Sequence, residues 1–600
     1  MAEKIVSPGV FTRENDLSFV QAGVEAIGGA IVGPTARGPV LVPTKVNSYA
    51  EYLDIFGEAY ESGSSTYQFF TSIAAKEYLK HNAPLTIVRV MGDSYFKASA
   101  SFSGSTQAET NGVPSVEEKL TGGSEIAFQI KTRGEGANLN SIGGNTPGTN
   151  QVLESGSANN FRWEIASSNT AKGTFNLLIR RGDDTIKRKV ILEQFTGLTM
   201  DPNDANYIGK RVGTQELTAK GDASTGYYLQ PTGSFPNRSK YIFIPEDSIA
   251  NIPNYLDENG TITTTAAAAS GAKFPGDSSG SFVGGADDYQ HPMKFYDDIS
   301  DSNIQGLVPN TAAQGKNAYT TALGLLANPD EYDINLTATP GLVHEGNYAS
   351  DLLDTSLIEA CENRGDCMAI VDPVYCFKGI TDATAEADKV DSSYAAMYWP
   401  WVQIPNTVLG NYIWVPQSTL LPAIYAQSDK LAHEWFAPAG LNRGGIEIAI
   451  QAERKLTHAN RDTLYEANVN PIATFPGEGV VVFGQKTLQK KASALDRVNV
   501  RRLLINLKKF VAGVSKFLVF ENNTAATRQR FLAQVEPYMQ TVQEQQGLFA
   551  FRVQMDEANN TPDVIDRNQM KGAIFLQPAK AAEFIIIDFN IMPTGATFDD

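Results

Sequence analysis

Residues 496–523 read DRVNVRRLLINLKKFVAGVSKFLVFENN, and their apolar side chains recur with the spacing of an amphipathic helix. At about 100° per residue, one face of this predicted helix carries Leu503, Leu504, Leu507, Phe510, Val511 and Val514. The other face carries Arg497, Arg501, Arg502, Lys508 and Lys509. The apolar face needs a core to pack on, whereas the basic face needs either water or an acidic partner.

The predicted helix lies in a basic block of an otherwise acidic chain. Residues 486–530 contain eleven Lys and Arg against two Asp and Glu, although the whole chain has a formal net charge of −18. A solvated surface helix accounts for such a block, and so does a docking face for a negatively charged partner. The basic block alone leaves both interpretations open.

Length and composition favour a large globular protein of several domains. The chain has 600 residues, of which 42% are hydrophobic and 19% are charged. Its net charge of −18 disfavours nucleic acid or an anionic membrane as an overall ligand. No apolar run approaches the length of a membrane span, and the start MAEKIVSPGVF lacks a secretory apolar region, so we expect synthesis in a cytosol.

Changes in sequence texture divide the chain into four predicted parts. Alternating strand and helix patterns favour an α/β core, and a region rich in Gly, Ser, Thr and Asn favours a β-rich, surface-exposed insertion. The fold class that we predict is therefore an α/β core plus an α+β C-terminal domain, with a β-rich insertion domain and extended N- and C-terminal arms. The predicted boundaries are 1–22 for the N-terminal linking arm, 23–95 plus 316–475 for the discontinuous core, 96–315 for the insertion, and 476–600 for the C-terminal domain with its terminal linking strand.

Several elements of the core and the insertion can be predicted from local patterns. The run IGGAIVG (27–33) is typical of a buried strand, and a helix follows with Asn47 or Ser48 as its N-cap and Gly57 beyond its end. A second helix is predicted over 66–80. In the insertion, FRWEIASS (161–168), TFNLLIRR (174–181) and IKRKVILEQF (186–195) predict antiparallel strands, whereas 261–285 has the composition of a loop.

The C-terminal domain is predicted to combine a long helix with strands. Thr524 can cap a helix that continues to Gln546, and three strand-like runs follow. These runs are LFAFRVQM (548–555), GAIFLQ (572–577) and EFIIIDFNI (583–591). The first 22 residues have too few local partners to form a domain, so we expect them to be stable only when paired with a sheet edge.

Motifs that would indicate catalysis fail on their spacing. In PGEGVVVFGQKT (476–487), Gln485 separates Gly484 from Lys486, so the Gly-Lys-Ser/Thr of a phosphate loop is missing. GDSSG (276–280) has no supporting histidine or aspartate pattern, and the five histidines include no i, i+4 pair. Cys361, Cys367 and Cys376 have neither a zinc spacing nor the number that a disulfide framework needs, so we expect buried thiols. We therefore predict no catalytic, cofactor or metal site, and no enzyme.

Longer segments resemble the contractile tail sheath proteins of myophages. The most specific are DRVNVRRLLINLKK (496–509) and NNTPDVIDRNQMKGAIFLQPAKAAEFIIIDF (559–589), and HANRDTLYEANVNPIATFPGEGVVVFGQKT (458–487) agrees with them. Nearer the N-terminus, SPGVFTREND (7–16) is similar to the N-terminal arm of the family and CENRGDCMAIVDP (361–373) to its central segment. Residues 96–315 match less well than the rest of the chain.

This resemblance implies a structural protein of a phage tail. Members of the family polymerise as stacked hexameric rings around a tail tube and contract to drive the tube through the host envelope for genome delivery. The implied partners are other copies of the chain, the tail tube protein, and the baseplate and tail-terminator proteins, with no cofactor, no nucleic acid and no direct lipid binding. The implied location is the virion tail, after synthesis and assembly in the host cytoplasm. The alternative is the sheath of a related contractile machine, a secretion system or a tailocin.

The resemblance also implies roles for individual residues. In the family, terminal segments of neighbouring subunits add strands to one another's C-terminal sheet, which fits strand addition as a general recognition mode. We therefore expect inter-subunit contacts from Val6, Val10, Phe11, Ile585, Ile587 and Phe589. The basic face of the helix is expected to face the tube through Arg497, Arg501, Arg502, Lys508 and Lys509.

Overall fold

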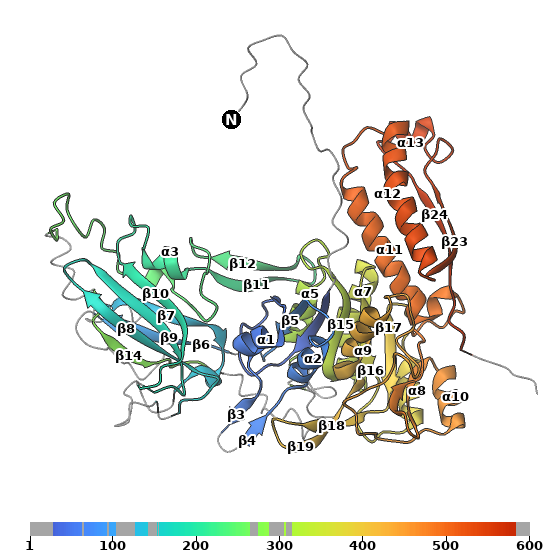
Figure 1. Ribbon diagram of the computed structural model, residues 1–600, viewed down its shortest axis with the longest axis horizontal. Helices are drawn as coiled ribbons and strands as arrows, with labels where there is room; N and C mark the ends of the chain where they lie inside the picture. The colour runs from blue at the N-terminus through green and yellow to red at the C-terminus, as the bar shows by residue number, and fades with distance from the viewer. Residues whose placement is uncertain are drawn as a thin grey trace, which may run out of the picture.

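The chain combines α-helices and β-strands in a central sheet, a strand-rich part and an upright helix–strand unit (Figure 1). The predicted mixture of helices and strands is confirmed. The predicted arm at 1–22 lies outside the residues that the structure describes, as do Val6, Val10, Phe11, Ile585, Ile587 and Phe589. This computed structural model describes residues 28–62, 65–92, 95–103, 126–141, 153, 155–185, 187–263, 274–286, 305, 307 and 315–583.

Within these residues, an eight-stranded sheet forms the centre of the molecule. Strands that lie far apart in the sequence meet in it, because β1 pairs in parallel with both β5 and β15. Two antiparallel strands, β2 and β22, close its edges. In sheet order the strands are β2 (Thr44–Val46), β5 (Leu85–Arg89), β1 (Gly28–Gly33), β15 (Ile334–Val343), β16 (Met368–Asp372), β17 (Ala395–Trp399), β21 (Val469–Phe475) and β22 (Gly479–Val482).

Helices cover both faces of this sheet, as a parallel sheet with continuous apolar runs requires. Ile31 of β1 packs in an apolar cluster with one set of helices, whereas its neighbours Ala30 and Val32 belong to the larger cluster that includes α5. The first set comprises α1 (Tyr49–Phe56), α2 (Phe70–Tyr78) and α9 (Gln417–Leu431). The second comprises α5 (Lys316–Leu325), α6 (Asn347–Leu352), the π-helix η4 (Leu353–Ile358) and α7 (Glu359–Arg364).

The ends of the first two helices test the local predictions. The Ser48 side chain accepts a hydrogen bond from the Glu51 amide, and Gly57 follows α1 with a φ of 72°, so both predicted caps are confirmed. The predicted start of the second helix is wrong, because α2 begins at Phe70. The residues before it, Ser65–Tyr67 (β4), pair instead with Tyr60–Ser62 (β3) as a hairpin.

The strand-rich part forms two antiparallel sheets on a shared apolar core. The predicted strands are confirmed as β8 (Phe161–Asn169), β9 (Thr174–Arg181) and β10 (Ile191–Thr199). The loop expectation for 261–285 is wrong at Ser278–Ser281 (β14), which pairs with β8. The second sheet comprises β6 (Lys97–Ser103), β7 (Ile126–Glu135) and β13 (Ile242–Phe243). The two sheets meet at Phe102 and Trp163, whose ring centroids lie 4.4 Å apart.

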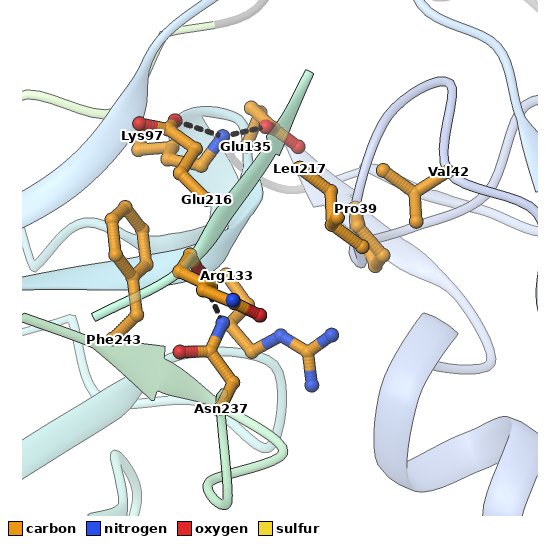
Figure 2. A pocket seen from close by; sticks show the side chains of 10 residues that line it. Pro39, Val42, Lys97, Arg133, Glu135, Glu216, Leu217, Asn237 and Phe243 are labelled. Carbon is orange, nitrogen blue, oxygen red and sulfur yellow. Dashed lines mark hydrogen bonds and ion pairs between the residues drawn. The ribbon is translucent and has the colours of Figure 1, made fainter. Parts of the chain in front are cut away.

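A charged junction joins the strand-rich part to the central sheet. Arg89 of β5, 2% exposed, donates a hydrogen bond to the Glu135 carbonyl, and the Glu135 carboxylate accepts one of 2.8 Å from the Val40 amide. Figure 2 shows the Lys97 ammonium between the carboxylates of Glu135 and Glu216 at a small pocket there. The bonds that cross the junction are those of Arg89 and Val40 with Glu135, so separating the two parts would leave the buried Arg89 guanidinium and the Glu135 carboxylate without these partners.

Smaller elements complete the described residues. The hairpin of β11 and β12 reaches from the strand-rich part to α5 (Figure 1). The remaining bounds are α3 (Ile208–Val212), β11 (Glu216–Asp222), β12 (Gly226–Thr232), α8 (Ile380–Ala387), β18 (Val402–Asn406), β19 (Asn411–Val415), β20 (Gln451–Ala452), α10 (His458–Glu466), and the short helices η2 (Ala137–Leu139), η3 (Glu246–Ser248) and η5 (Ala494–Asp496).

Candidate functional site

The C-terminal unit is the part of the chain for which the sequence predicts contacts with the tube and with neighbouring subunits. Its two long helices, α11 (Val498–Lys516) and α12 (Ala525–Glu544), stand beside a ribbon of β23 (Leu548–Gln554) and β24 (Ala573–Pro578), with α13 (Pro562–Asp566) at the far end (Figure 1). The Thr524 side chain caps α12 by accepting from the Thr527 amide, as predicted. Leu503, Leu507 and Val514 bury the predicted apolar face of α11 in the core of this unit.

The basic side chains of α11 do not form one outward face. Arg501 and Arg502 are only 4% and 5% exposed, so the prediction that they face outward is wrong. The physical reason is that the central part of the same chain supplies their partners. Arg502 donates a hydrogen bond of 2.5 Å to Asp429 and lies 4.9 Å from the centre of the Tyr425 ring. Arg501 donates to Ser393, and its guanidinium lies 4.0 Å from the centre of the Tyr394 ring.

The lysines farther along α11 continue this contact with the central part. Lys509 donates to the Asp333 carboxylate at 2.5 Å, and its side chain is 10% exposed. Lys516 pairs with Asp330 at 2.9 Å, and Lys508 donates to the Tyr394 hydroxyl at 3.0 Å. Lys508 stays exposed, so it is the member of the predicted basic face that a second molecule can reach without a change in the fold.

Arg497 is the remaining member of the five predicted basic residues. It contacts Glu583, the last residue that the structure describes. Its guanidinium donates two hydrogen bonds, of 2.7 and 2.9 Å, to the Glu583 carboxylate. The Tyr465 hydroxyl and the Gln485 side-chain amide donate to the same carboxylate at 2.7 and 3.0 Å. We call these four residues the Glu583 clamp. The clamp fixes the chain at the residue that precedes 584–600.

The environment of Glu583 favours its charged form. Burial alone would raise the pKa of its carboxyl, but the hydrogen bonds from Arg497, Tyr465 and Gln485 outweigh burial and lower the pKa below the ordinary value. Because a charge-assisted hydrogen bond is stronger than a neutral one, the clamp stabilises the native state only while Glu583 is ionised.

Replacement of Glu583 by glutamine is expected to remove this pH-dependent stabilisation. The folded-state pKa lies below the unfolded value, so the wild-type advantage is present above the unfolded pKa and is lost as the pH falls through the folded pKa. At pH 7 we expect the variant to lose about 1–2 kcal/mol in urea unfolding, and wild type and variant to converge in acid. Glu521→Gln, a change at an exposed residue of the same unit, is the matched control. A Glu583→Gln deficit of equal size at every pH would contradict the ionic role.

The ribbon of β23 and β24 offers its backbone to a further strand. Phe551 pairs with Leu576 and Val553 with Ile574, and all four side chains pack on the core of the unit. Among the residues that the structure describes, no third strand pairs with either member, so each has a free edge. Unpaired amides and carbonyls on an edge are the groups that an added strand binds.

The ribbon also exposes two aromatic side chains. Phe549 and Phe575 are 64% and 57% exposed on this two-stranded sheet. A ribbon of two strands is marginally stable by itself and depends here on its contact with α12. Additional strands would therefore be expected to stabilise it.

The described residues bear on the expectations for metal ligands, membrane spans and thiols. Among them, no cluster of three or more His, Cys, Asp and Glu side chains is arranged to bind a metal ion. No helix in this described part combines the length and the apolar character that crossing a bilayer requires. Cys361 and Cys367 are buried as expected, whereas Cys376 is half-buried.

Family comparison assigns the second half of the chain. Residues 312–488 match the phage tail sheath protein central domain, and residues 490–592 match the phage tail sheath C-terminal domain. Residues 312–592 belong to the phage tail sheath family. The boundary between these two sheath domains lies just before α11, so the contacts of Arg501, Arg502 and Lys509 described above join one sheath domain to the other.

Individual sheath proteins agree with this assignment. The tail sheath protein of Vibrio phage KVP40 is 31% identical over 309 residues, which are 48% of this chain and 46% of the relative. The tail sheath protein of Enterobacteria phage T4 is 38% identical over 187 residues, 31% of this chain and 28% of the relative. The chain thus spans less than half the length of these relatives.

The fold likeness extends further along the chain than the sequence likeness. The crystal structure of a sheath tail protein from Listeria innocua superposes with a TM-score of 0.51 at 11% identity, covering 93% of this chain and 96% of that one. At this identity the similarity concerns the fold alone. It includes the strand-rich part, where the sheath resemblance of the sequence is weakest.

Sequence reasoning missed the partners of the basic residues. Asp429, Tyr465 and Glu583 lie 73, 32 and 86 residues from the arginines that they contact, at positions with no local motif. Only the charge balance could have indicated such partners, because acidic residues elsewhere in the same chain can neutralise a basic block.

Proposed function

We propose that this chain is a structural subunit of a phage contractile tail sheath. The observation that carries the proposal is the succession of the sheath central and C-terminal domains over residues 312–592. The proposed subunit polymerises as stacked hexameric rings around a tail tube, and contraction of the polymer drives the tube through the host envelope for genome delivery. It acts as a structural element and not as an enzyme.

The proposed architecture follows the four parts of the sequence. An α/β core formed by 23–95 and 316–475 carries a β-rich insertion at 96–315 and an α+β C-terminal domain at 476–600, and the arm at 1–22 links neighbours. The proposed partners are further copies of the chain, the tail tube protein, and the baseplate and tail-terminator proteins. The proposed location is the virion tail, with assembly in the host cytoplasm.

The proposed link between subunits is strand addition at the C-terminal ribbon. The free edges of β23 and β24 support this mechanism, and residues 1–22 and 584–600 are the proposed donors. The Glu583 clamp would fix the start of the second donor segment on its own subunit. A link made of backbone hydrogen bonds to a ribbon can persist while rigid parts of neighbouring subunits shift, as contraction requires.

The proposed tube contact is now confined to the exposed part of α11. Arg501 and Arg502 serve the interior of the chain, which leaves Lys508 as the proposed contact for an acidic tube surface. One exposed ion pair contributes about 0–1 kcal/mol and is screened by salt. Many such contacts along a sheath hold the tube and still release it.

Lys508→Glu is expected to weaken assembly on tubes and leave the fold intact. Reversing one exposed charge should lower the affinity of each contact by about 2- to 10-fold at low salt, and the difference should shrink at high salt. Co-sedimentation with tail tubes at two salt concentrations measures this effect. Lys571→Glu, at another exposed lysine of the C-terminal unit, is the matched control. Equal binding by both variants and wild type would remove Lys508 from the tube contact.

Electron microscopy of the purified full-length chain tests the proposed function directly. A sheath subunit is expected to form hollow, ridged tubes, alone or around added tail tubes. Dispersed particles at every protein concentration, with and without tail tubes, would contradict the proposal.

A further inference from the structure

A tight turn in the sheath central domain brings two cysteine side chains together. Helix α7 ends at Arg364, and Gly365, with a φ of 69°, reverses the chain toward β16. The Sγ atoms of Cys361 and Cys367 lie 3.2 Å apart across this turn. Both residues are free thiols, 2% and 1% exposed. A disulfide requires a separation near 2.05 Å, so a shift of about 1 Å would bring the two sulfurs to bonding distance.

The surrounding side chains hold this turn in place. Arg364 donates hydrogen bonds of 2.8 and 2.9 Å to Asp366 and another of 2.8 Å to the Tyr332 carbonyl. The Lys509 ammonium of α11 lies 3.6 Å from the Asp366 carboxylate. The cysteine pair therefore lies beneath the contact between the two sheath domains.

The two sulfurs differ in reactivity. The hydrogen bond between them lowers the pKa of Cys367; burial opposes this effect, and the Arg364 guanidinium adds to it. The same hydrogen bond and burial raise the pKa of Cys361. Cys367 consequently reaches the thiolate form first, and the thiolate is the nucleophilic form of cysteine.

We propose that Cys361 and Cys367 form a latent disulfide, which a peroxide closes into a reversible covalent link between α7 and β16. The Cys367 thiolate attacks one oxygen of hydrogen peroxide, the O–O bond breaks, and the departing hydroxide takes up a proton to become water. The resulting sulfenic acid is attacked by the Cys361 sulfur, which forms the S–S bond and releases a second water. The two sulfurs lose two electrons, and one peroxide is reduced to two waters.

The burial of both sulfurs determines when this reaction occurs. Oxidant reaches them during local opening of the turn at the end of α7, the short helix that continues from the π-helix η4. In a reducing cytosol the thiols stay reduced, and the link closes after the protein meets an oxidising medium. If the chain is a phage sheath, as proposed above, that change comes with release of the particle from the host.

Cys376 provides an internal comparison. It is half-buried, its Sγ lies 3.9 Å from the Glu453 carboxylate, and burial together with this neighbouring charge raises the pKa of its thiol. Cys376 is therefore expected to remain a thiol under conditions that join the pair.

The test uses the purified full-length chain with hydrogen peroxide at neutral pH. Thiols are counted after denaturation, and peptides are mapped by mass spectrometry without reduction. We expect the count to fall by two of the three thiols, a Cys361–Cys367 cross-link, and full reversal by dithiothreitol. Cys376→Ser should give the same cross-link, and Cys361→Ser should instead leave a sulfenic acid on Cys367 that dimedone traps.

Other products would overturn the proposal. One such result is sulfinic acid on Cys367 without a cross-link, and another is oxidation that begins at Cys376. A third is that Cys361 and Cys367 of the wild-type chain stay reduced in peroxide until denaturant is added. If a serine variant fails to fold, the wild-type measurement is sufficient to decide the test. Because the readout is a bond within one chain, it is independent of whether the chain assembles into tubes.

Discussion

Arg502→Ala is expected to destabilise the protein by roughly 3–5 kcal/mol. The guanidinium is 5% exposed, donates to Asp429 and lies against the Tyr425 ring. Truncation would leave the Asp429 carboxylate, itself only 16% exposed, without its cation, and would remove the side-chain packing of the arginine. The loss should therefore be much larger than that of a surface ion pair, which is about 0–1 kcal/mol.

Thermal and urea unfolding followed by circular dichroism measure this loss. Lys508→Ala, on the exposed side of the same helix, is the matched control and should stay within about 0.5 kcal/mol of wild type. The double variant Arg502→Leu with Asp429→Leu removes both charges and should recover a large part of the stability. An Arg502→Ala chain as stable as Lys508→Ala would show that the pair does not hold the two sheath domains together.

The amphipathic pattern of 496–523 predicted the helix but not the direction of its basic side chains. Leu503, Leu507 and Val514 are buried where the 3.6-residue period places them, because an apolar face has one stable position, on a core. A basic side chain has two, in water or against an acid. Arg501 and Arg502 bind Ser393 and Asp429, which lie 108 and 73 residues away in the sequence. The residues near the two arginines therefore do not indicate whether their side chains face water or an acidic partner.

Strands with an alternating apolar pattern were likewise easier to predict than an edge strand that lacks this pattern. The runs FRWEIASS and TFNLLIRR carry the alternation of half-buried strands, and they pair as β8 and β9. Ser278–Ser281 has the composition of a loop, yet it forms β14, because the free edge of β8 supplies the hydrogen bonds that its own side chains do not dictate. Composition describes side chains, whereas an edge strand is recruited through its backbone.

The Glu583 clamp could not be predicted for the same reason as the arginine contacts. Tyr465, Gln485, Arg497 and Glu583 come from separate elements, and none belongs to a recognisable motif. The strand-like run EFIIIDFNI (583–591) predicted that Glu583 begins a terminal strand. The structure adds that Glu583 binds Arg497, the N-cap residue of the basic helix, a contact that neither the charge count nor the helical period indicated.

Removal of residues 1–20 is expected to abolish connected sheaths while leaving a folded, soluble chain. The first strand of the central sheet begins at Gly28 and pairs with β5 and β15, so the deletion spares every described element. What it removes is the proposed donor for the free edges of β23 and β24. About six added ladder bonds at roughly 0.5–1.5 kcal/mol each give a link of several kcal/mol. Losing that link should lower the association constant by several powers of ten.

Negative-stain microscopy and sedimentation velocity on matched preparations separate loss of assembly from loss of folding. The deleted chain should sediment as a single subunit with an unchanged circular dichroism spectrum, whereas the full-length chain polymerises. A chain lacking only the polar end PTGATFDD (593–600) keeps the predicted linking residues Ile585, Ile587 and Phe589 and the matched domain at 490–592, so it is the control for truncation and should still polymerise. Normal tubes from the chain without residues 1–20 would mean that contacts among the folded parts suffice for assembly. The free edges of the ribbon would then need a different occupant.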